Sequence, residues 1–221
     1  MFFEPIPPQD EPREPRYRPP PWLCAPEGML PGVVALELVL AKTDKAAVCV
    51  SRIGAYPAGF ELQLLTMVAD EDIDLDPMLF GPHRPRRGRH ARESPDGTLR
   101  FGVQFADGSK ATNAGGHHSP GKGEGTPQGP VMNSGGGGGG GGSWRQDFWV
   151  WPLPPPGPLT FAAEWGDAGI PLTSSEIDSK LLLDAADRAQ TIFTAEQLSE
   201  SPQSQVTQHV FTQDESPQVR E

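Results

Sequence analysis

The sequence predicts a mainly β fold, and we expect an antiparallel two-layer β-sandwich of six or seven strands with one C-terminal helix and long disordered segments. Two observations lead to this prediction. Short segments with alternating apolar and polar side chains recur along the chain, whereas only one segment has helical spacing. Glycine and proline each occupy 26 of the 221 positions. This is well above their usual share, so much of the chain must form turns, linkers or disordered segments.

Six segments have the two-residue period of a strand with one buried face. In the first, "GVVALELVLA", Val34 and Leu40 lie on the apolar side and Glu37 lies on the other. The sequence "TDK" connects it to the second segment, so these two predict a hairpin, and the third segment continues the meander. The six segments are residues 32–41, 46–57, 60–69, 98–109, 144–151 and 159–165.

The third and fourth segments predict the core most directly. Apolar residues alternate with others at 60–64 and at 99–105, so these apolar residues should point inward. The residues expected to face inward are Phe60, Leu62, Leu64, Leu99, Phe101, Val103 and Phe105.

The one predicted helix is "TSSEIDSKLLLDAADRAQTIF", residues 173–193. Thr173 and Glu176 have the spacing of a capping box, and Pro171 lies just outside the segment. Apolar residues such as Ile177 and Leu181 then recur near helical spacing. We expect this helix to cover one sheet or its open end.

The composition also suggests how the chain is divided. Residues 1–30 predict a proline-rich extended arm that packs on the domain through Trp22 and Leu23, because repeated proline favours extended backbone. Residues 31–193 form one domain, with an irregular charged loop at 70–97 and a glycine-rich disordered insertion at 113–142. Residues 194–221 predict a disordered tail, since they contain few apolar side chains.

The insertion ends in eight consecutive glycines, residues 135–142. Ordering them would cost on the order of 10 kcal/mol of conformational entropy, with no side chain buried in return. We therefore expect the tract to stay mobile and to act as slack between two neighbouring strands.

Charge and cysteine content limit the function classes. The net charge of −11 and the pI of 4.9 argue against general binding of nucleic acid or of anionic membranes. No segment has the pattern of a signal peptide or of a membrane span. The two cysteines, Cys24 and Cys49, do not suggest a disulfide framework. Together these features predict a cytoplasmic protein.

Several motif matches lack the structural context that their chemistry needs. "GHHSPGKG", residues 116–123, has the spacing of a phosphate-binding loop, but "EGTPQGP" follows it and cannot begin a helix. The alternating aspartates of "DEDIDLD" are followed by Pro77, where a calcium loop needs glycine. The basic run at 83–92 has no interleaved aromatic residues for base stacking. We assign no catalytic, cofactor-binding or metal-binding residue from these motifs.

Two other stretches support a resemblance. "FGVQFADGSKATN" and "WVWPLPPPGPLTFAAEW", together with the richness in Ala, Gly, Pro and Arg, resemble uncharacterised proteins of high-GC bacteria. The resemblance implies a bacterial, intracellular protein and no particular activity.

We expect a non-catalytic protein-interaction module, whose partner and oligomeric state the sequence does not identify. Trp149 and Trp151 lie on one face of an aromatic strand and are the candidate contacts with a partner or ligand. The first alternative is a carbohydrate-binding β-sandwich, which requires both rings to be exposed and coplanar. The other explanation for these rings is burial beneath the helix or the arm.

The second alternative is a metal-dependent hydrolase assembled from distant loops. Its candidate residues are Asp72, Asp74, His83 and His117. This alternative requires that these loops converge in one fixed pocket.

Overall fold

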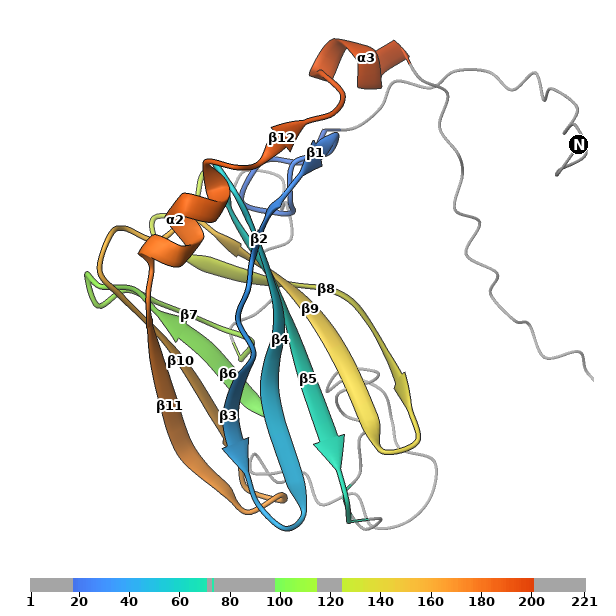
Figure 1. Cartoon of the computed structure of the whole chain (residues 1–221), viewed down its shortest axis with the longest axis vertical. Coiled ribbons are helices and arrows are strands. Elements are labelled where there is room, and N and C mark those ends of the chain that lie inside the picture. The colour runs from blue at the N-terminus through green and yellow to red at the C-terminus, as the bar shows by residue number, and fades with distance from the viewer. Residues whose placement is uncertain (1–17, 71–72, 74–97, 115–124, 201–221) are drawn as a thin grey trace, which may run out of the picture.

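The chain folds into a two-layer antiparallel β-sandwich (Figure 1). Alternating apolar side chains cover the facing sides of its sheets. The structure is a computed structural model that describes residues 18–70, 73, 98–114 and 125–200. The larger sheet contains β2 (Gly32–Val34), β3 (Leu38–Lys42), β4 (Ala46–Tyr56), β5 (Gly59–Val68), β9 (Ser143–Trp151) and β8 (Val131–Gly140). Its order is β2-β4-β5-β9-β8, and β3 also pairs with β4.

The smaller sheet has the order β11-β10-β6-β7. Its strands are β6 (Arg100–Gln104), β7 (Lys110–Thr112), β10 (Pro158–Trp165) and β11 (Ile170–Asp178). The two layers thus hold ten described strands, more than the six or seven expected, because β7, β8 and β11 were not predicted and the first segment divides into β2 and β3.

The predicted core faces are confirmed. All seven residues named above from the third and fourth segments are buried between the sheets. Phe101 of β6 stacks on Phe161 of β10, with ring centroids 6.4 Å apart, and meets Phe148 of β9 at 5.7 Å. Since Phe148 belongs to the larger sheet, this aromatic cluster joins the two layers.

A β-bulge changes which side chains of β4 face the core. The pairing of β4 with β5 shifts between Val50 and Arg52, so Val50 and Ile53 are both fully buried although three positions separate them. The expected alternation through the hairpin is therefore interrupted at Ser51. The hairpin itself is confirmed, because β3 pairs antiparallel with β4.

The predicted helix at 173–193 is wrong at both ends, because α2 stops at Ala186 and residues 190–191 form strand β12. Residues 173–178 belong to β11, which pairs with β10 over Leu159↔Ile177 and neighbouring positions. In this stretch Thr173, Ser175 and Ile177 are half-buried while the residues between them are exposed, which is the period of a strand. Pairing with β10 outweighs the local capping-box pattern. The helix that does form is α2 (Lys180–Ala186), and it begins after Ser179.

The prediction of a disordered glycine insertion is also wrong where the structure describes it. β8 covers six of the eight glycines and pairs with β9 from Val131↔Trp151 to Gly140↔Ser143. Gly141 and Gly142 make the connecting turn at φ of 59° and 79°, as a two-residue hairpin turn requires. The Val68 amide donates to the Gly142 carbonyl at 2.7 Å and fixes this turn to β5.

The indole of Trp144 explains part of the glycine content. A Cβ atom at Gly137 or Gly139 would lie 2.8–2.9 Å from ring atoms of Trp144. Trp144 is only 8% exposed, and its ring packs against these two glycines. The Gln146 amide also donates to the Ser134 hydroxyl and to the Gly135 and Gly136 carbonyls at 2.8–3.2 Å. These backbone pairings and the burial of this ring offset the entropy cost of ordering the glycines.

The first and last described segments meet at one end of the sandwich (Figure 1). β1 (Met29–Leu30) pairs antiparallel with β12 (Gln190–Thr191). A second described helix, α3 (Ala195–Glu200), begins with reciprocal hydrogen bonds between Thr194 and Gln197, a capping box. The predicted disordered tail at 194–221 therefore begins with a helix, and the rest of it lies outside the described residues.

Candidate functional site

The outer face of the larger sheet carries an aromatic surface near the end where β1 lies. Tyr56 comes from β4, Asn133 from β8, and Trp149 and Trp151 from β9. Asn133 stands directly across from Trp149 in the β8–β9 register. The Tyr56 and Trp149 rings meet edge to face, with centroids 5.7 Å apart. We call these four residues the aromatic cradle.

The N-terminal arm occupies the aromatic cradle. The Leu23 amide donates to the Pro20 carbonyl at 2.9 Å, so residues 20–23 form a turn. Trp149 Nε1 donates to the Pro21 carbonyl at 3.0 Å. The Trp22 ring packs edge-on against Trp151 at 6.4 Å. The predicted packing of the arm through Trp22 is thus confirmed.

Asn133 completes the recognition of the arm. Its Nδ2 donates to the Trp22 carbonyl at 2.7 Å and to the Leu23 carbonyl at 3.2 Å. The cradle therefore binds the carbonyl oxygens of three consecutive residues. Asn133 is buried, so these bonds also satisfy a polar group that would otherwise be costly to bury.

Gly59 and Tyr56 shape the surroundings of the Trp149 ring. A Cβ atom at Gly59 would lie 2.9 Å from the Trp149 ring and 2.4 Å from the Val150 carbonyl, so only glycine lets the indole lie this close to the strand. Burial, together with the neighbouring Glu61 carboxylate, raises the pKa of Tyr56 to about 12. The phenol therefore keeps its proton at neutral pH and can donate a hydrogen bond.

The two tryptophans proposed from the sequence lie in the cradle, but they do not form an exposed platform. Trp149 is only 4% exposed and Trp151 is partly buried, and the arm covers them. The coplanar exposed rings that a carbohydrate platform requires are therefore not present in this arrangement. Sequence reasoning missed Tyr56 and Asn133, because only strand pairing brings them beside Trp149.

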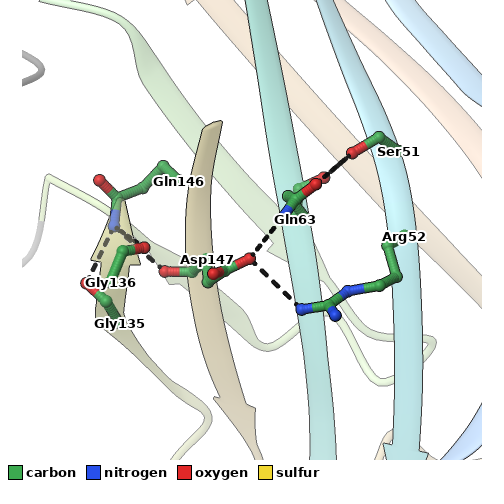
Figure 2. A network of polar contacts seen from close by, with 7 residues as sticks. All are labelled: Ser51, Arg52, Gln63, Gly135, Gly136, Gln146 and Asp147. Carbon is green, nitrogen blue, oxygen red and sulfur yellow. Dashed lines mark hydrogen bonds and ion pairs between the residues drawn. The ribbon is translucent and has the colours of Figure 1, made fainter. Parts of the chain in front are cut away.

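A polar network lies on the same outer face, farther along the strands (Figure 2). Gln63 Nε2 donates to the Asp147 carboxylate at 2.9 Å, and the Ser51 hydroxyl donates to the Gln63 side-chain oxygen at 3.1 Å. Arg52 forms an exposed ion pair with Asp147 at 3.5 Å. These contacts link β4, β5 and β9 side by side through half-buried and exposed side chains.

The four residues of the hydrolase alternative, Asp72, Asp74, His83 and His117, lie outside the described residues, as do the basic run at 83–92 and the motif at 116–123. Within the described ranges, no three His, Cys, Asp or Glu side chains gather as metal ligands would. None of the described helices is long and apolar enough to cross a membrane.

The two cysteines are free thiols in the structure. Burial raises the pKa of both Cys24 and Cys49, and for Cys24 the nearby Glu27 and Glu61 carboxylates raise it further. Both therefore stay protonated at neutral pH. A protonated thiol is a poor nucleophile, so neither thiol is activated by its surroundings in this structure.

The fold and the cradle together define an antiparallel β-sandwich that holds a proline-led turn on an aromatic surface. Comparisons with family models, with curated proteins and with solved structures gave no match for this chain.

Proposed function

We propose that this chain is a non-catalytic protein-interaction module and that the aromatic cradle is its binding site. In this proposal the cradle binds a turn of the Pro-Pro-Trp-Leu type, and the N-terminal arm is its resident occupant. One observation carries the proposal: Trp149 and Asn133 donate to the carbonyls of Pro21, Trp22 and Leu23.

Those contacts favour recognition of a class of segments over one fixed sequence. Every residue has a carbonyl oxygen, so the three hydrogen bonds can be made by any chain that adopts the same turn. Proline predisposes a chain to that turn at low entropic cost. The aromatic contact between Trp22 and Trp151 adds preference for an aromatic residue after the prolines.

The arm acts as an intramolecular competitor. A segment joined to its site by a short linker has an effective concentration in the millimolar range. A partner present at a lower concentration must therefore bind the cradle more tightly than the arm does, in proportion to the difference in concentration. Otherwise the arm must first be displaced by another process. The cradle would then bind only partner segments whose affinity for it is higher than that of residues 20–23.

The test uses the full chain with residues 19–23 replaced by glycine and serine, so that the cradle is emptied at constant chain length. A synthetic peptide of residues 18–25, with serine in place of Cys24, is then titrated in. We expect it to bind and to shift the indole N–H signal of Trp149 in a nitrogen–proton NMR spectrum.

Trp149→Phe in the same emptied chain is the matched variant, because it keeps a ring and removes the donor. It should weaken the peptide about 5- to 10-fold, the effect of losing one hydrogen bond. A peptide that fails to bind the emptied cradle, or that binds the Trp149→Phe chain equally well, contradicts the proposal.

A further inference from the structure

β8 is the outermost strand of the larger sheet on the side away from β2. Alternate backbone N–H and C=O groups of such a strand point away from the sheet and are free to pair with another strand. Residues 134–140 are exposed and consist of Ser134 followed by six glycines. We call these seven residues the glycine edge.

Only some of these glycines are required by the fold. Gly137 and Gly139 make room for Trp144, whereas a Cβ atom at Gly136, Gly138 or Gly140 would meet nothing within 4 Å. Each glycine in a strand is destabilising by roughly 0.5–1 kcal/mol relative to alanine. The bulge before Gly137 and the turn after Gly140 account for glycine at the ends of the tract, whereas close approach of another backbone is a further reason for a bare position such as Gly138.

The glycine edge also lacks most features that protect an edge strand. β8 contains neither proline nor a charged residue, although a bulge bends it between Ser134 and Gly137. The outer strand of the smaller sheet is different, because β11 carries Pro171, Glu176 and Asp178 at exposed positions. Among the described strands, β8 is therefore a long edge without charge or proline to block it.

Arg145 gives this edge a charge preference. It stands opposite Gly138 in the β8–β9 register, is exposed, and has no ion-pair or hydrogen-bond partner for its guanidinium among the described residues. An added strand would lie two inter-strand spacings, about 9.6 Å, from β9. Because Gly138 has no side chain, Arg145 can extend across β8 toward a carboxylate on that strand.

We propose that the glycine edge binds an extended segment of a partner protein as an additional strand, and that Arg145 selects an acidic side chain on that segment. A second copy of this chain fits less well. β8 has no acidic residue to offer Arg145, and two glycine strands contribute little of the area that a stable dimer needs. Main-chain hydrogen bonds supply the affinity of such strand addition.

The experiment uses the full chain and ten-residue strand-forming peptides of threonine and valine with a central Glu, Gln or Lys. Amide hydrogen exchange, followed by NMR, locates the binding. We expect the Glu peptide to slow exchange within residues 134–140 and to bind about threefold more tightly than the Gln peptide at low salt. The same Glu peptide methylated on every backbone nitrogen should not bind.

Three variants test the role of the bare position and of the charge. Arg145→Gln should abolish the preference for Glu over Gln, and Arg145→Glu should shift the preference to the Lys peptide. Gly138→Val, which the open space at that position accommodates, should also reduce the Glu preference by screening Arg145. Gly129→Val is the control, since that position is equally open and lies outside β8.

Several results would overturn the proposal. They are binding of the methylated peptide, protection outside residues 134–140, a Glu preference that survives Arg145→Gln, and absence of binding by every peptide at millimolar concentration. Protection of the same amides that rises with protein concentration alone would identify a second copy as the occupant and would also overturn it. Trp149→Phe should leave peptide binding here unchanged, which separates this test from that of the cradle.

Discussion

Adding one methyl group to the glycine tract should change the free energy of unfolding in opposite directions at the adjacent positions Gly138 and Gly139. A Cβ atom at Gly139 would lie 2.1 Å from the Ser143 carbonyl oxygen and 2.8 Å from Trp144 Cα, so the backbone must move. A Cβ atom at Gly138 would meet nothing within 4 Å. We therefore compare Gly139→Ala with Gly138→Ala.

The magnitude follows from what each methyl group displaces. Overpacking of this kind costs about 1–3 kcal/mol. Expulsion of the Trp144 ring would cost at most about 4–6 kcal/mol, from about 150–250 Å² of buried surface at 25 cal/mol per Å². We expect Gly139→Ala to lower the free energy of unfolding by about 2 kcal/mol. Gly138→Ala should raise it by about 0.5 kcal/mol, because alanine has less backbone freedom to lose.

Urea unfolding measures the difference directly. With a denaturant slope of about 2 kcal/mol per M, the two midpoints should differ by about 1 M. A mobile connector would respond to both substitutions equally. Equal midpoints for the two variants would therefore show that β8 does not hold these glycines against Trp144, and the account of the tract given above would fail.

Three further predictions concern buried polar groups. The Thr66 hydroxyl is buried without a hydrogen-bond partner among the described residues. Thr66→Val should therefore raise the free energy of unfolding by about 1 kcal/mol, and a lower free energy of unfolding would show that the hydroxyl is hydrogen-bonded. The Ser179 hydroxyl donates to the Pro155 carbonyl and accepts from the Gly157 amide. Ser179→Ala should lower the free energy of unfolding by about 1–3 kcal/mol in the same urea assay, and no change would contradict this role. Tyr56 loses its proton near pH 10 when unfolded and near pH 12 when folded, so stability should fall as the pH rises from 10 to 12, and Tyr56→Phe should remove that part of the fall.

The inner faces of the sheets could be predicted because alternation reports burial directly. Phe60, Leu62 and Leu64 lie on one side of a strand in the sequence, and all are buried in the structure. The bulge in β4 could not be predicted, since nothing local distinguishes the shift after Val50 from continued alternation.

The errors share one physical cause, which is hairpin pairing with the neighbouring strand that the local side-chain pattern does not report. The glycines of β8 have no side chains that could signal a strand, and Trp144 on β9 decides their conformation. Residues 173–178 carry a local helix signal, but β10 offers them a partner. The aromatic pair of the cradle was found from composition, whereas Asn133 joins Trp149 only through the β8–β9 register.

The pairing of β1 with β12 has a mechanical consequence. Met29 pairs with Thr191 and Leu30 with Gln190, and the chain leaves this ribbon on one side through Gly28 and Ile192. A force that pulls the two ends apart therefore meets these pairs one after another, as in opening a zipper. The aromatic cradle carries the N-terminal load first, and the ribbon opens pair by pair once the arm has left it.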